Sequence, residues 1–238
     1  MKNKLILYIV LFCIIIIDNS SISDEFTLKS EKIDVLESGS IIEASGNVEI
    51  ITDNDLDIKS NKSVLNKTKS FLEASGNVKI FDKKNDLLIN ANYVSYDKNK
   101  DLIFIEDKSE TSLKKEYKLK TSNLFFDRKN KKIFTNEKGE LTDLLENKIN
   151  FDSFELDLHT EVAKIKNFEF IDINNNNFFL DSAEININKK EIIGDNAELY
   201  FDKKIFGNSE NDPRIFGKTL KDNEIETVLT EAEFTSCK

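Results

Sequence analysis

Few residues of this chain could carry out covalent or metal chemistry. His159 is the only histidine of the 238-residue sequence, and the two cysteines, Cys13 and Cys237, lie near opposite ends. Nucleophilic catalysis and zinc binding both need several such groups close together. The polar residues beside His159 also place it in an expected solvent-exposed turn. We therefore expect no catalytic residue, no metal site and no cofactor.

Carboxylates are numerous enough that acid–base chemistry has to be considered. The sequence has 44 Asp and Glu against 34 Lys and Arg, with a formal net charge of −10. Glycoside hydrolysis needs only a pair of carboxylates. Most carboxylates here, however, occupy the polar positions of alternating segments or turns, which is typical of a solvated surface. The composition favours a binding or structural protein over an enzyme, and the negative charge argues against nucleic acid as a partner.

The N-terminal residues have the layout of a secretory signal peptide. Two lysines precede the apolar run Leu5–Ile17, which is shorter than the roughly 20 residues that a membrane-spanning helix needs. Ser23 offers a small residue for cleavage, so residues 1–23 are predicted to be a signal peptide, and the mature chain would start near Asp24. An uncleaved N-terminal anchor is the alternative, and either would place the rest outside the cytoplasm.

The elements that position all other residues repeat with a period of about thirty. The segment Ile42–Ile50, IEASGNVEI, returns thirty positions later as Leu72–Ile80, LEASGNVKI. Such a period, combined with alternating apolar and polar residues, indicates short stacked β-strands. No sustained helical period is found, although 141–150 could form one or two helical turns. We expect an all-β fold with one elongated body over residues 24–205.

Turns are expected once per repeat. Gly46 and Gly76 each precede an asparagine and an alternating segment, which predicts a tight turn or bulge with a positive φ angle. Gly139 and Gly194 could be weaker copies, and we interpret these glycines as architecture and not as ligand contacts. Solvated turns are predicted at five further polar positions: Asn66, Asp97, Asp127, His159 and Asn188.

The repeated Ala-Ser-Gly-Asn-Val element resembles a known family. At this spacing it is similar to the OstA-like fold shared by LptA, LptC and the N-terminal part of the lipopolysaccharide-assembly protein LptD, over about residues 25–205. The resemblance implies an open β-jellyroll whose two sheets form an apolar slot for the acyl chains of lipopolysaccharide. It also implies a Gram-negative periplasmic protein that passes these chains along by binding alone.

The C-terminal residues resemble one branch of that family. Asn211–Thr219, NDPRIFGKT, and Thr230–Cys237, TEAEFTSC, are similar to the junction that precedes the LptD β-barrel. We therefore expect residues 206–238 to be an irregular junction segment, with the barrel itself absent. Cys237 would match a junction cysteine that can enter a disulfide. A truncated or split LptD without lipid transport is an alternative.

The resemblance further implies partners and a location. The expected partners are lipopolysaccharide, an LptA-like jellyroll that pairs with the strand edge near Phe26–Val35, an outer-membrane barrel and an LptE-like lipoprotein. The expected location is the periplasm, in association with the outer membrane. An LptA- or LptC-like bridge protein is the nearest alternative within the family.

Apolar residues of the alternating segments are the candidates for contact with lipid. The same residues would also build an ordinary core, because inward apolar alternation is the default in a sandwich of sheets. A structural β-repeat protein that binds no lipid therefore stays open as an alternative. The candidates are Val48, Ile50, Val78, Ile80, Ile89, Phe104, Phe126, Phe134, Leu156, Phe168, Phe170 and Ile187.

Overall fold

The structure is a computed structural model that describes residues 26–236, except 175, 204–209, 211 and 224. The expected signal peptide, residues 1–23, and Cys237 lie outside the described residues. The predicted all-β class is confirmed, because the described residues form one eighteen-stranded sheet and a single short 3-10 helix. The elements are β1 (Phe26–Lys29), β2 (Lys32–Leu36), η1 (Glu37–Gly39), β3 (Ile41–Thr52), β4 (Leu56–Asn66), β5 (Phe71–Asp82), β6 (Leu87–Asp97), β7 (Leu102–Leu113), β8 (Tyr117–Asp127), β9 (Lys132–Thr135), β10 (Gly139–Thr142), β11 (Lys148–Phe151), β12 (Ser153–Asp157), β13 (Val162–Ile171), β14 (Asn177–Asn186), β15 (Glu191–Tyr200), β16 (Arg214–Asp222), β17 (Thr227–Thr230) and β18 (Glu233–Thr235).

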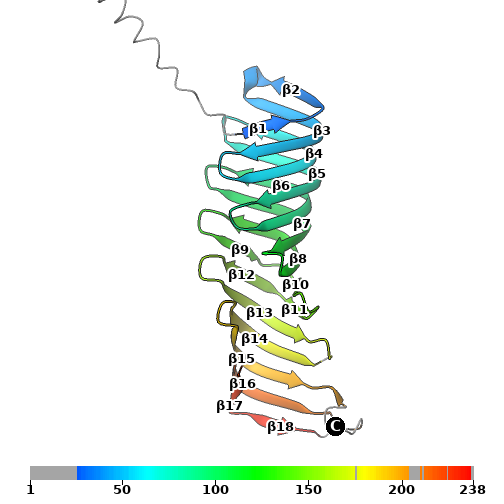
Figure 1. Ribbon diagram of the computed structural model, residues 1–238, viewed down its shortest axis with the longest axis vertical. Coiled ribbons are helices and arrows are strands. Elements are labelled where there is room, and N and C mark those ends of the chain that lie inside the picture. The colour runs from blue at the N-terminus through cyan, green and yellow to red at the C-terminus, as the bar shows by residue number, and fades with distance from the viewer. Residues whose placement is uncertain (1–25, 175, 204–209, 211, 224, 237–238) are drawn as a thin grey trace, which may run out of the picture.

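The strands follow one another as an antiparallel meander that stacks along the long axis of the molecule (Figure 1). From β3 to β8, each strand pairs with the next one in the sequence. Short strands act as the two halves of a longer one: β9 and β10 both pair with β8, and β11 and β12 both pair with β13. The meander then continues from β13 to β16.

Each long strand near the N-terminus is bent at its middle by a bulge. The register of β3 shifts between Ser45 and Val48, and φ is +78° at Gly46 and +47° at Asn47. The copy in β5 has φ of +75° at Gly76, so the predicted bulge with positive φ is confirmed. The bend brings the two halves of each strand over one another and rolls the sheet into the open, jellyroll-like form.

The other two glycines have a different role from the predicted one. Gly139 and Gly194 are absent from the residues with positive φ, so the interpretation as copies of the bulge is wrong. A Cβ atom on Gly194 would lie 2.5 Å from the Leu180 side chain, and one on Gly139 would lie 2.4 Å from the Phe151 ring. These glycines are needed for close packing and not for backbone conformation.

The predicted turns are confirmed, but in two of them the accepting residue lies two positions earlier than predicted. In each turn a side-chain oxygen of Asn or Asp accepts a hydrogen bond from a backbone N–H two or three residues later, as Asn66 does from Lys69. His159 lies exposed inside its turn, and the accepting side chain there is Asp157. The accepting residues of the five turns are Asn66, Asp97, Asp127, Asp157 and Asn186.

Two segments differ from expectation because strand pairing dominates them. Residues 141–150 form no helical turn: β10 and β11 make a hairpin closed by Asp143, whose side chain accepts from the Asn147 backbone at 2.9 Å. The C-terminal tail is not irregular where it is described, because β16 pairs with β15, and β17 and β18 pair with β16. Adding these strands satisfies backbone groups that the edge of β15 would otherwise expose.

Candidate functional site

The bent strands bring two rows of turns near each other on one side of the rolled sheet. The first turn row consists of the turns after β3, β5, β7, β10 and β13, and the second consists of the turns after β4, β6, β8, β12 and β14. Backbone hydrogen bonds run along each row, for example from Lys83 to Asp55 in the first and from Arg128 to Asp101 in the second. Contacts between the rows decide where the interior is closed.

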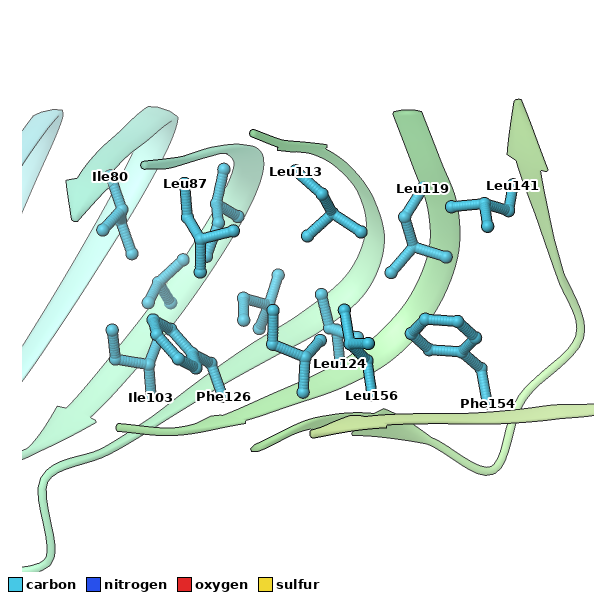
Figure 2. Close-up of a cluster of buried hydrophobic side chains, with 14 of the residues drawn as sticks. Ile80, Leu87, Ile103, Leu113, Leu119, Leu124, Phe126, Leu141, Phe154 and Leu156 are labelled. Carbon is cyan, nitrogen blue, oxygen red and sulfur yellow. The ribbon is translucent and has the colours of Figure 1, made fainter. Parts of the chain in front are cut away.

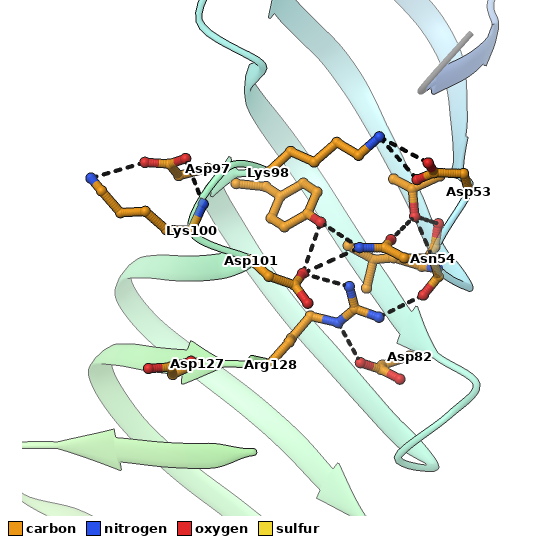
Figure 3. Close-up of polar contacts among 12 residues, drawn as sticks. Asp53, Asn54, Asp82, Asp97, Lys98, Lys100, Asp101, Asp127 and Arg128 are labelled. Atoms are coloured by element: carbon orange, nitrogen blue, oxygen red, sulfur yellow. Dashed lines mark hydrogen bonds and ion pairs between the residues drawn. The ribbon is translucent and has the colours of Figure 1, made fainter. Parts of the chain in front are cut away.

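A polar clasp joins the two rows near the N-terminal end (Figure 3). We use this name for Asn54, Asp82, Tyr96, Asp101 and Arg128. The Arg128 guanidinium donates to Asp82 Oδ2 at 2.7 Å, to Asp101 Oδ1 at 2.8 Å and to the Asn54 carbonyl oxygen at 2.7 Å. The Tyr96 hydroxyl donates to Asp101 at 2.9 Å and accepts from the Asn54 amide at 2.8 Å. Each of the five residues therefore contacts a residue of the other turn row, either directly or through another residue of the clasp.

Burial and ion pairing together set the protonation of the clasp. Asp82 is fully buried and Arg128 is 7% exposed. Burial acts to lower the pKa of Arg128, but the hydrogen bond and the charge of Asp82 outweigh it and raise that pKa. Burial, together with the hydrogen bond to Asp101, raises the pKa of Tyr96 to about 12. Arg128 thus stays cationic and Tyr96 stays neutral over the physiological range.

The interior beneath the clasp is filled by side chains and offers no slot. Leu56, Ile103, Ile105 and Phe126 have 0% of their surface exposed. Figure 2 shows Ile80 pointing from one layer of strands toward the other layer, where Leu124 and Phe126 lie side by side on β8 and point back. Six of the candidates for lipid contact are buried in the core and line neither of the hollows described below: Val48, Ile50, Val78, Ile80, Ile89 and Phe126.

Two apolar hollows open farther toward the C-terminus. The central hollow has a volume of about 230 Å³, and the C-terminal hollow about 310 Å³. Ile192 lines both, so the two hollows adjoin at this side chain. The central hollow is lined by Leu87, Leu113, Lys114, Tyr117, Leu141, Ile149, Phe154, Leu156, Leu158, Glu161, Ala163, Ile185, Asn186, Ile187, Lys190 and Ile192. The C-terminal hollow is lined by Phe168, Phe170, Phe178, Leu180, Ile192, Leu199, Phe201, Ile215, Leu220, Asp222, Thr227 and Leu229.

Aromatic rings make up much of the wall of the C-terminal hollow. The rings of Phe168 and Phe170 are stacked with centroids 6.5 Å apart, and those of Phe170 and Phe178 are 5.7 Å apart. Phe201 meets the edge of Phe178 at 5.9 Å. Such a surface matches an apolar ligand, and its two polar lining residues, Asp222 and Thr227, are hydrogen-bonded to each other.

The structure thus divides the predicted lipid-contacting residues into three groups. Leu156 and Ile187 line the central hollow, and Phe168 and Phe170 line the C-terminal one. The six core residues named above are packed away from both hollows. The third group is Phe104 and Phe134.

Phe104 and Phe134 were expected to face inward, and this is wrong. Their sequence neighbours Ile103 and Ile133 are fully buried, so the two rings point to the opposite, outer face. There they stack on Phe125, with ring centroids 4.7 Å and 5.1 Å away. The cross-strand pairs Phe104–Phe125 and Phe125–Phe134 set this arrangement.

Several lining residues were missed by sequence reasoning. Tyr117, Phe178, Leu199 and Ile215 line the hollows without having been singled out. Alternation around Leu199 was the available signal, because Ala197 and Leu199 are buried while their neighbours are more exposed. Ile215 lies in the C-terminal tail, which was expected to be irregular, so no residue of the tail was predicted to line the interior.

The described residues contain no group of three or more His, Cys, Asp and Glu side chains that could hold a metal ion. In the same part of the chain, no helix has the length and apolar content that crossing a membrane requires. Neither finding adds a second candidate site to the hollows.

Comparison with known proteins does not identify a family for this chain. No protein-family model matches the sequence, and no curated protein matches it. Among solved structures, the chain is similar to LptH, the LptA-homologous periplasmic component of the lipopolysaccharide transport device from Pseudomonas aeruginosa. The identity is 8% and the TM-score is 0.26, over 59% of this chain and 81% of that chain. A likeness this weak carries no argument about function.

Proposed function

We propose that the chain is an exported lipid-binding module of the OstA-like type, which holds acyl chains in its two hollows and passes them on without chemistry. One observation carries the proposal: two adjoining apolar hollows lie inside a rolled sheet, beyond the polar clasp. Burial of an acyl chain is favourable by about 0.8 kcal/mol per methylene group. Apolar cavities of about 150 Å³ are known to take up benzene, so the larger hollows here can accept segments of a chain.

The proposed lipid is lipopolysaccharide and the proposed place is the periplasm, next to the outer membrane. Both rest on the signal-peptide layout of residues 1–23 and on the resemblance of the repeated Ala-Ser-Gly-Asn-Val element to the LptA, LptC and LptD family. The tail motif within Asn211–Thr219 favours the N-terminal part of LptD within that family. An outer-membrane barrel and an LptE-like lipoprotein are proposed partners on the same ground.

An LptA-like jellyroll is the proposed partner at the N-terminal end. Among the described strands, β1 and β2 pair with β3 on one side only. Ile33 is 46% exposed and Val35 is 63% exposed beside this open edge. A partner strand could add to it by backbone hydrogen bonds while these side chains become covered.

The packed core beneath the clasp favours one alternative. A structural β-repeat protein would be expected to fill its interior, as the strands from β3 to β8 do with residues such as Ile80 and Ile105. A protein of that kind would not need the two hollows, because larger apolar side chains could have filled them. We therefore place lipid binding first.

A substitution at the wall between the hollows tests the proposal. Ile192→Trp would place a bulky ring where the two hollows adjoin and is expected to weaken binding of lipopolysaccharide to the purified protein, measured by titration calorimetry. Ile193→Trp is the matched control, because Ile193 lies on the same strand and is 46% exposed on the outer face. Equal binding by both variants, with both folded, would show that lipid does not use the hollows.

A further inference from the structure

The mouth of the central hollow carries charges that an apolar chain alone does not require. Lys114 and Glu161 form an ion pair across the two turn rows, from the turn after β7 to the turn after β12. Lys190, in the turn after β14, lines the same hollow. Three turns, far apart in sequence, therefore bring two ammonium groups and one carboxylate to the rim of an otherwise apolar cavity.

Tyr117 lines the same hollow as both lysines. Burial is the main reason why the pKa of this phenol is raised, with added contributions from Glu116 and Asp143. The charges of Lys114 and Lys190 act in the opposite direction on the same group. Both ammonium groups thus lie within electrostatic reach of one hydroxyl on the cavity wall, with Glu116 and Asp143 also near it.

We propose that this mouth binds the anionic head group of an acyl lipid, with Lys114 and Lys190 as its cationic contacts and Glu161 as the carboxylate that the head group displaces. The inference rests on the proposed function and adds the head-group class to it. A phosphate group matches the site because it carries more charge and more acceptor oxygens than the Glu161 carboxylate. The acyl chain would then occupy the hollow while the head group stays at the wet rim.

The proposal also accounts for binding by a protein of strongly negative net charge. The formal net charge of the sequence is −10, which repels phosphate at long range. At the central hollow, Lys114 and Lys190 bring positive charge to the lining, where Glu161 lines the same hollow and Glu116 and Asp143 lie near Tyr117. An ion pair elsewhere on the surface provides a contrast. Lys132 pairs with Glu155 at 2.6 Å, and neither residue lines the central hollow.

The test compares two amphiphiles with the same chain and different head groups. Dodecyl phosphate and dodecyl maltoside are titrated into the full-length protein below their micelle-forming concentrations. We expect Lys114→Gln and Lys190→Gln each to weaken dodecyl phosphate binding by about tenfold, which corresponds to the loss of one charge-assisted contact. Dodecyl maltoside binding should not change.

Glu161→Gln is the most discriminating variant, because substitutions of the two partners of the ion pair should have opposite effects on dodecyl phosphate binding. Removal of the competing carboxylate is expected to strengthen dodecyl phosphate binding, whereas a purely structural ion pair would make Glu161→Gln and Lys114→Gln act alike. Lys132→Gln and Glu155→Gln are the matched controls and should leave both amphiphiles unaffected. Unfolding midpoints in urea verify that each variant is folded.

The outcomes separate this inference from the proposed function. Equal binding of both amphiphiles with no effect of the lysine variants would overturn the head-group site and leave acyl binding intact. Failure of both amphiphiles to bind would contradict the proposed function itself. Binding of inorganic phosphate as tight as that of dodecyl phosphate would also overturn the inference, because it would show a site for free phosphate and not for a lipid.

Discussion

Arg128 is the residue on which closure of the N-terminal part depends most. Its guanidinium contacts three groups on other turns, and its principal partner Asp82 is fully buried. Removal of one member of a buried ion pair leaves the other charge without compensation. The clasp therefore has to be kept whole or replaced as a whole.

We predict that Arg128→Ala lowers the free energy of unfolding by about 3–5 kcal/mol, the usual cost of breaking a buried ion pair. Urea denaturation monitored by circular dichroism would measure the loss. Lys59→Ala is the control, because Lys59 pairs with Glu49 on the exposed surface and should have little effect. A loss for Arg128→Ala no greater than that of the control would contradict the structural role given to the clasp.

At the scale of the strands, the sequence pattern did not determine which residues of an apolar run face inward. The start of β7 reads Leu-Ile-Phe-Ile from Leu102 to Ile105, an unbroken apolar run in which period-two alternation cannot decide which residues face inward. Pairing of Phe104 with Phe125 decided it and placed both rings outside. Where apolar and polar residues alternate cleanly, as in β12, the pattern identifies the inward face, and the candidate Leu156 is buried there.

The bulges were the elements that the sequence predicted best, because the backbone requirement is visible in the residue types. Glycine followed by asparagine provides two successive residues that tolerate positive φ. The cost of another residue there is local and can be measured. The same reasoning failed for Gly139 and Gly194, where close packing and not φ excludes a side chain.

Gly76→Ala is predicted to destabilise the fold by about 1–2 kcal/mol, the usual cost of a left-handed conformation for a residue with a Cβ atom. The added atom would also lie 2.9 Å from the Asn61 side chain. Asn77→Gly, with φ already at +50°, should cost nothing by this mechanism. Thermal unfolding of both variants would test the assignment, and a neutral Gly76→Ala would refute it.

At the scale of the whole molecule, the interior changes along the long axis from a packed core to open hollows. The repeat predicted the stack, because each unit has to bury its apolar face against its neighbours. It could not predict the change, since the apolar residues look alike in both parts. The clasp that closes one part joins Arg128 to residues 46 and 74 positions earlier in the sequence, a distance that no local pattern reports.

Because the interior changes in this way, the central claim predicts that acyl chains contact the hollows and not the packed core. The claim can be tested by placing a photoreactive phenylalanine at four positions, one at a time. Phe178 lies in the C-terminal hollow, Ile187 lies in the central one, Phe126 is in the packed core and Phe125 is on the outer face. Each position reports one environment.

The most direct measurement is photocrosslinking of these four variants to lipopolysaccharide, with adducts detected by immunoblotting. The account predicts adducts from Phe178 and Ile187 and none from Phe126 or Phe125. Adducts from none of the four, or from the outer face alone, would contradict lipid binding in the hollows.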